Sequence, residues 1–139
     1  MAFESAGAGE LFLLGRLLFG GVLAFTGLNH FLNVEQMAPY AEAKGLPAPA
    51  AAVYGSGGLL VVSGVLVILG AYPVVAAGAL ATFLVGSAVL MHDFWAAPDD
   101  QVQDEMTQFL KNVALAGGAV SLLSVAGTSW PYSVGVTLF

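Results

Sequence analysis

Three short segments of this 139-residue chain carry side chains that can move protons or hold an anion. They are centred on His30, His92 and Lys111, and amides stand beside two of them, at Asn29 and Asn112. Imidazole changes its charge near neutral pH and can act as general acid, general base or metal ligand, while an ammonium group stabilises a developing anion. In apolar surroundings such groups are costly unless paired or hydrated, so several of them at one depth indicate a functional site.

Apolar helices must position these side chains. The chain is 58% hydrophobic and only 9% charged, with a mean hydropathy of +0.87, a balance far from that of soluble domains. A helix of about 20 apolar residues crosses the roughly 30 Å hydrocarbon core of a bilayer. Four segments of that kind fit the sequence, at residues 11–31, 50–71, 73–95 and 100–127. The prediction is a single all-α domain over residues 1–139, a transmembrane four-helix bundle.

The connections between these helices assign their ends to two sides of the membrane. Gly70 and Pro73 mark a tight turn near Tyr72, between the second and third helices. Four spans put both termini on the same side as this turn, which we call side A. The loops of residues 32–49 and 96–105 share the opposite side, side B. Both lysines lie toward side B, so the positive-inside rule predicts that side B is cytoplasmic and the termini extracytoplasmic.

Composition excludes several kinds of protein. Without cysteine, the chain can hold neither a disulfide relay nor a thiolate metal site. A net charge of −6 makes the chain acidic and argues against nucleic acid and anionic lipid as partners. The first apolar segment is interrupted by Arg16, and its N-terminal flank has no Lys or Arg. We therefore expect this segment to stay in the mature protein rather than act as a signal peptide.

The first predicted helix has a stripe of small residues with an ionisable group at each end. Its members are spaced by 4, 3, 4 and 3 positions: Arg16, Gly20, Leu23, Gly27 and His30. This spacing puts them on one helical face, and glycines there invite a neighbouring helix to pack closely. Arg16 and His30 are therefore expected to point into the bundle, with Arg16 either bonded to backbone carbonyls or extended to the side A surface.

A similar stripe of small residues is predicted on the third helix, at Gly78, Ala81, Val85, Ala88 and His92. Both histidines then lie near side B, at the level of the first turns of the last helix. We expect a polar pocket there, with walls formed by His92, by His30 with Asn29, and by Lys111 with Asn112. The simpler interpretation is that the histidines are interfacial hydrogen-bonding groups and that Lys111 extends to the surface.

Two further patterns concern the side B surface. Asn33 as a cap, Pro39 and an end at Gly45 predict a broken surface helix that lies over the side B mouth. Asp100 stands three residues before Gln103, which is the spacing of a capping box, and acids follow in the first turn. The last helix is therefore predicted to begin near Asp100.

Histidines on facing helices can also ligate a metal. Haem ligation by His30 and His92 would need both rings directed at one iron across the bundle, and it is the less favoured interpretation. A zinc or iron site lacks a third ligand unless Glu105 or Asp93 turns inward. No metal site is predicted.

The polar positions and the glycine-rich segments around them resemble the DoxX family of small four-helix membrane proteins. The resemblance covers about residues 15–118, through GRLLFGGVLAFTGLNHF, GGLLVVSGVLVILG, MHDFW and QFLKNVALAGG. Tyr54 departs from it, because relatives often carry a glutamate there. The resemblance implies that a set of residues occupies the recurrent polar positions of the family: Arg16, His30, His92, Trp95, Lys111 and Asn112.

The resemblance also implies redox chemistry, because family members are linked to oxidoreductase assemblies, including quinone-coupled thiosulfate oxidation and a membrane complex that handles oxidative stress. We expect a membrane subunit whose side B pocket receives a quinone head group that diffuses laterally between helices. His30 and His92 are the candidate catalytic proton donors, and Lys111 would stabilise the developing quinol anion. The candidate substrate-binding residues are Arg16, Asn29, Trp95, Glu105 and Asn112.

The sequence contains no evident electron carrier, so the expected partners are the lipid bilayer and a redox protein that docks on the acidic side B loops. Self-association stays open. The alternative function is a non-catalytic membrane scaffold or a small-solute carrier, in which the polar cluster only locks helix packing. Hydrogen bonds between membrane helices average about 0.6 kcal/mol, so single substitutions would then have mild effects.

Overall fold

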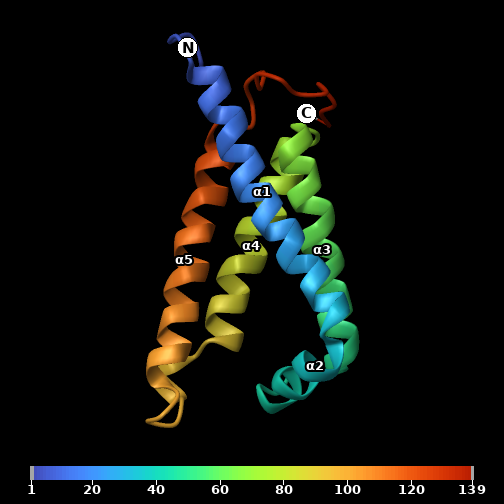
Figure 1. Ribbon diagram of the computed structural model, residues 1–139, viewed down its shortest axis with the longest axis vertical. Helices are drawn as coiled ribbons and strands as arrows, with labels where there is room; N and C mark the ends of the chain where they lie inside the picture. The colour runs from blue at the N-terminus through green and yellow to red at the C-terminus, as the bar shows by residue number, and fades with distance from the viewer. Residues whose placement is uncertain (1, 139) are drawn as a thin grey trace.

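The computed structural model describes residues 2–138, and these residues form helices, turns and loops without strands (Figure 1). The helices are α1 (Ala8–Leu32), α2 (Val34–Ala43), α3 (Pro49–Leu69), α4 (Pro73–Met91) and α5 (Val102–Ser124), with a short 3-10 helix, η1 (Phe94–Ala96). The prediction of an all-α protein is confirmed for this part of the chain. Three helical stretches within it are long and apolar enough to cross a membrane: Ala8–Leu32, Pro49–Leu69 and Pro73–Ala96.

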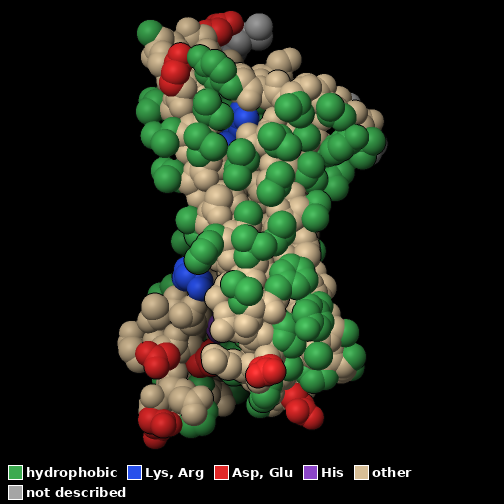
Figure 2. Space-filling view, turned by 45° about the vertical axis from the view of Figure 1, so that its right-hand side comes forward, with side chains coloured by type: hydrophobic (Ala, Val, Ile, Leu, Met, Phe, Trp, Pro, Cys, Tyr) green, Lys and Arg blue, Asp and Glu red, His purple; other side chains and the backbone are tan. Residues whose placement is uncertain are grey.

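The long helices associate as two pairs that diverge toward one end. α1 packs along α3 and α4 packs along α5, and the two pairs separate below the level where α1 crosses α4 (Figure 1). Both ends of the chain and the α3–α4 turn lie at one end of the molecule, as predicted for side A. α2 and the α4–α5 connection lie at the other end, side B. Figure 2 shows carboxylates near both ends and many hydrophobic side chains between them.

Paired glycines bring α1 and α3 into close contact. A Cβ atom added at Gly20 would lie 2.5 Å from the Gly64 carbonyl oxygen, and one added at Gly27 would lie 2.6 Å from that of Gly57. Real Cβ atoms never approach a carbonyl oxygen that closely, so only glycine permits this backbone contact. Gly20 and Gly27 are buried together with Arg16 and Leu23, which confirms the predicted buried stripe on α1.

The stripe predicted on the third long helix is confirmed at Ala81 and Ala88, which lie against the core, but it is wrong at Gly78 and Val85. Gly78 has open space where a Cβ would lie, and Val85 is 53% exposed. The buried face instead contains larger side chains that fill the centre of the molecule, among them Leu80 and Leu84. His92 was predicted to continue this helical face, but α4 ends at Met91 and His92 has φ −122° and ψ 48°. Its side chain therefore does not follow helical spacing.

The helix boundaries near side B differ from the prediction in two places. α2 was predicted to be broken, but it runs without a break from Val34 to Ala43 and contains Pro39. Gly45 follows the helix with a φ of 82°. Asn33 stands at its N-cap position, but its side chain bonds to Asn29 instead of capping the helix. α5 begins at Val102 without a side-chain cap, so the capping box predicted at Asp100 and Gln103 does not form.

The turn at side A follows the prediction. Gly70 ends α3 with a φ of 65°, a left-handed conformation that glycine adopts without strain. Pro73 is the first residue of α4, where its missing N–H removes no helical hydrogen bond. This turn joins the two helix pairs at side A, so they can diverge only toward side B.

Candidate functional site

A cavity of about 520 Å³ lies between the two helix pairs, in the half of the molecule nearer side B. Its walls come from α1, α2, α3, α4 and α5 and are mainly apolar. The structure brings the three candidate catalytic residues His30, His92 and Lys111 together on these walls. The other polar side chains that line the cavity are those of Thr26, Asn29, Tyr40, Ser56, Ser87, Gln108 and Asn112. A volume of this size suits a small organic ligand.

His30 is held on α1 by a hydrogen bond to α3. Its Nδ1 atom lies 2.9 Å from Ser56 Oγ, and the Ser56 hydroxyl donates its proton to the Val53 carbonyl oxygen at 3.0 Å. Ser56 can then only accept from the imidazole, so Nδ1 carries the proton. In the neutral ring, the lone pair is on Nε2. His30 is thus oriented as a hydrogen-bond acceptor, and as a proton donor after it is protonated.

His92 is oriented in the same way by a carboxylate. Its Nδ1 atom lies 3.0 Å from Glu105 Oε2, and Glu105 is buried at the start of α5. A carboxylate that accepts a hydrogen bond from Nδ1–H fixes the tautomer and the orientation of the ring, and leaves Nε2 directed away from it. Glu105 is not on the cavity wall, although it bonds two residues that are, His92 and Tyr40. It is therefore placed to position His92.

Tyr40 joins α2 to this pair. Its hydroxyl oxygen lies 2.6 Å from the Met91 carbonyl oxygen and 2.7 Å from Glu105 Oε1. Burial, followed by the hydrogen bond to the Glu105 carboxylate, raises the pKa of Tyr40 well above that of a free phenol. The phenol is therefore neutral at any physiological pH and remains a donor.

Lys44 completes the network at the side B end of the cavity. Its ammonium nitrogen lies 2.5 Å from Asp93 Oδ1 and 3.7 Å from Glu105 Oε1. Asp93 and Glu105 are thus both ion-pair partners of Lys44. The described residues contain no group of three or more His, Asp or Glu side chains that could hold a metal ion.

Asn112 and Lys111 supply the α5 side of the cavity. Asn112 is buried and donates from Nδ2 to Ser87 Oγ at 3.2 Å, which ties α5 to α4. Lys111 is exposed at the cavity edge, where its ammonium group donates to the Gln108 amide oxygen. Within the described residues, no carboxylate pairs with Lys111. Its charge is therefore available to a ligand.

Arg16 lies away from the cavity. It is 14 residues before His30, about 21 Å along the helix, and it is fully buried. Its guanidinium group lies near the rings of Phe12 and Trp130. It donates to four backbone carbonyl groups, those of Val67, Ile68, Pro131 and Tyr132. Arg16 was predicted either to bond backbone carbonyls or to extend to the side A surface, and the structure shows carbonyl bonding. Arg16 is therefore not near the other candidate substrate-binding residues that line the cavity.

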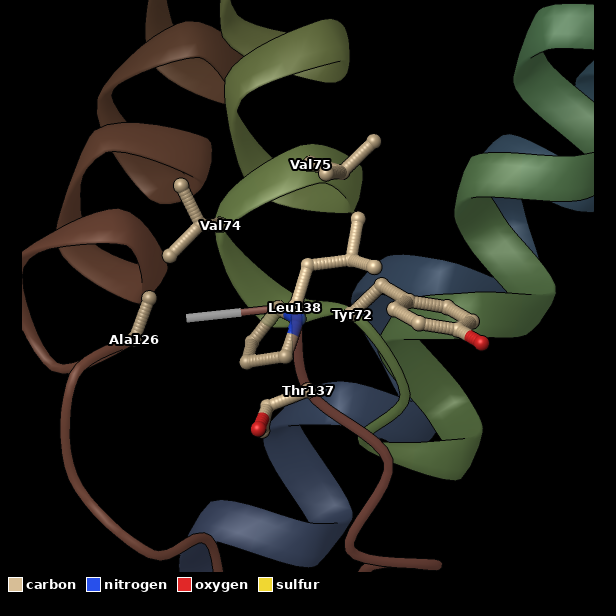
Figure 3. Close-up of a pocket in the computed structure, with 7 residues that line it drawn as sticks. Tyr72, Val74, Val75, Ala126, Thr137 and Leu138 are labelled. Carbon is tan, nitrogen blue, oxygen red and sulfur yellow. The ribbon is translucent and has the colours of Figure 1, made fainter.

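Trp95 is also separate from the cavity. It lies on η1, is 59% exposed, and packs edge to face with Phe94 and Phe109. A second hollow, at side A, is lined by residues that include Tyr72, Thr137 and Leu138, but it has a volume of only about 10 Å³ (Figure 3). One water molecule needs about that much space, so this hollow cannot hold an organic ligand.

Several residues of the site were not among the predicted site residues. Tyr40 and Lys44 are two of them, and Lys44 entered the prediction only as one of the two lysines that orient side B. A signal was present, because the two residues are four positions apart and share one helical face. Ser56 and Ser87 carried no signal, since isolated serines are common among the small residues of membrane helices.

The fold and the cavity define a class of protein: an all-helical integral membrane protein with a cavity between its helices. The sequence profile of the DoxX family matches residues 11–93, and the chain belongs to this family. It is 27% identical over 117 residues to the inner membrane protein YphA of Escherichia coli strain K12, a match that covers 84% of this chain and 83% of that protein. No solved structure matches the chain. The resemblance to DoxX and the membrane location are confirmed.

Proposed function

We propose that this protein is a quinone-interacting subunit of a membrane oxidoreductase system and that the cavity receives the quinone head group. The observation that carries this proposal is the cavity itself, with about 520 Å³ of mainly apolar space and both histidines on its walls. A quinone head group combines an apolar ring with two carbonyl oxygens. It needs such space and a few hydrogen-bonding groups at its ends.

The residues have distinct roles in this proposal. Reduction of a quinone to a quinol takes two electrons, supplied by a redox partner, and two protons. His92 and His30, each with Nδ1 occupied by a partner, deliver protons from Nε2 or accept them in the reverse direction. Lys111 stabilises the negative charge that develops on a quinone oxygen, and Asn29 and Asn112 add hydrogen bonds.

α5 is the fourth membrane helix of a four-helix bundle, since it packs along α4 and its second half, from Val113, carries no charge. Side B is cytoplasmic and the termini are extracytoplasmic, as the positions of both lysines favour.

The redox partner docks on side B. This end exposes the carboxylates of Glu35, Glu42, Asp99, Asp100 and Asp104. Neither lysine neutralises them, because Lys44 pairs with Asp93 and Glu105. A basic protein surface would be attracted to this end, and the association would weaken as salt increases.

The test is the binding of a short-chain ubiquinone analogue to the purified protein in detergent. His92→Ala and His30→Ala should each lower the affinity roughly tenfold or more, since each removes a head-group partner in a desolvated site. Ser121→Ala is the control, because Ser121 bonds only its own helix and lies outside the cavity. Thermal melting shows whether each variant is folded. Unchanged affinity in both folded histidine variants would refute the proposal and favour a scaffold or a small-solute carrier.

A further inference from the structure

The side B end of the cavity is covered by α2. Met37, Tyr40 and Ala41 of this helix line the cavity. The Tyr40 hydroxyl reaches across to Glu105 on α5, and Lys44, one turn later, binds the connection that follows α4. α2 is therefore fastened to both helix pairs, since it also packs on α3. It separates the cavity from the water of side B.

The seam between α1 and α5 is closed toward side A and open toward side B. The Phe19 ring of α1 packs on Gly118 of α5, where an added Cβ would lie 2.9 Å from the ring. Beyond this contact the two helices diverge (Figure 1). Thr26 and Asn29 on α1 and Lys111 on α5 line the cavity in that diverging part. The cavity therefore reaches the lateral surface of the protein between α1 and α5.

We propose that the ligand enters the cavity from the bilayer, through the α1–α5 seam, and that it has a polar head and a long apolar tail. The tail then lies along the seam, where Val22 is 57% exposed and Leu115 forms part of the wall. The inference rests on the proposed function for the identity of the head group, and it excludes water-soluble solutes as ligands.

The polar edge of this seam distinguishes it from the seam between α3 and α4. Gly86 and Leu90 of α4 also line the cavity, and Leu90 is exposed, but they offer no polar side chain. A polar head loses its hydration as it leaves the membrane interface, and it moves most readily past groups that replace those hydrogen bonds. Asn29 and the Lys111 ammonium, which pairs with no carboxylate among the described residues, provide such groups at the α1–α5 seam.

The absence of native cysteine permits a test that uses no quinone. Ser87→Cys places one thiol on the cavity wall, and Leu115→Cys is the second variant if the first does not fold. Each variant is reconstituted in nanodiscs, where both aqueous faces are accessible. It is then treated with a long-chain alkyl maleimide, which dissolves in lipid, or with a sulfonated maleimide, which stays in water. We expect modification by the alkyl reagent and none by the sulfonated reagent.

A blocked seam should slow the reaction with the alkyl reagent. Thr26→Trp adds a large ring to the seam and should slow the alkyl reaction roughly tenfold. Thr82→Trp is the matched control, because Thr82 also bonds the carbonyl four residues earlier in its helix but lies outside the cavity. Equal reaction with both reagents would show access from water and overturn the inference. Slowing by Leu90→Trp without slowing by Thr26→Trp would assign entry to the α3–α4 seam and also overturn it.

The maleimide reactions test the lateral opening separately from quinone binding. If the alkyl reagent enters through the seam and no quinone analogue binds, the lateral opening stands and the quinone assignment fails. If quinone binds while both maleimides react equally, the proposed function stands and the lateral opening fails.

Discussion

Lys44 and Asp93, the two fixed charges that bound the longest uncharged stretch of the chain, form an ion pair with 2.5 Å between Nζ and Oδ1. The stretch between them contains α3 and α4, which run across the molecule and back. The pair therefore joins the end of α2 to the end of α4 and holds α2 over the cavity.

Loss of this pair should loosen α2. In Lys44→Gln, backbone amides of α2 should exchange with deuterium roughly threefold faster or more, because one of the two side chains that hold the helix is lost. Glu42→Gln is the control, since Glu42 is exposed nearby. Hydrogen exchange with mass spectrometry makes the measurement. Equal exchange in the two variants would mean that the pair does not hold α2.

Glu105 should act on ligand binding through His92. In Glu105→Gln the carboxylate that fixes the His92 tautomer is lost, and the affinity for the ubiquinone analogue should fall by about 1 kcal/mol, roughly fivefold. Asp104→Asn, an exposed neighbour on the same helix turn, should leave the affinity unchanged. In NMR spectra, the imidazole signals of His92 should shift in Glu105→Gln but not in Asp104→Asn. No change in either readout would remove the positioning role.

Tyr40 should resist ionisation. The pKa of Tyr40 is raised in the folded protein, so its neutral form stabilises the fold. This stabilisation is complete below the pKa of a free phenol, about 10, and it decreases as the pH rises from there toward the pKa of the folded state. At about pH 11 the folded protein and Tyr40→Phe should show the same tyrosinate absorbance. After unfolding in SDS the variant should show one quarter less, since the chain has 4 tyrosines. A deficit before unfolding would contradict this account.

Arg16 should be essential for stability but not for binding. Arg16→Ala removes the donor to four carbonyl groups and should lower the free energy of unfolding by about 3 kcal/mol, which corresponds to a fall in Tm of about 10 °C. Arg16→Lys keeps the charge but not the planar fork and should lose part of that stability. Folded Arg16→Lys should bind the quinone analogue normally. Impaired binding would place Arg16 in the ligand site.

Two adjacent glycines should respond oppositely to alanine. Gly20→Ala drives a methyl group into the Gly64 carbonyl and should destabilise the protein by about 1–3 kcal/mol. Gly21→Ala meets no atom within 4 Å and should leave the protein as stable or stabilise it by up to about 1 kcal/mol. Thermal melting in one detergent compares them. Equal losses would contradict the close α1–α3 packing.

The sequence was sufficient to predict the long helices and the α1 stripe, because apolar length and glycine spacing are local properties. It also predicted that His30, His92 and Lys111 share one end of the molecule. It failed for the His92 end of the α4 stripe, since His92 lies after the last helical residue and its direction depends on the Glu105 contact. The spacing of Tyr40 and Lys44 puts them on one face of α2, but their roles depend on contacts with Glu105 and Asp93, which are distant in sequence and which no local pattern determines.

The most direct test of the quinone site is photolabelling of the purified protein with an azidoquinone, followed by mapping of the adducts by mass spectrometry. The account predicts adducts on the cavity segments of α1, α4 and α5, around residues 26–30, 83–92 and 108–115, and their loss when unlabelled quinone competes. Adducts spread over the outer faces of the helices and unaffected by competitor would contradict a quinone site between the two helix pairs.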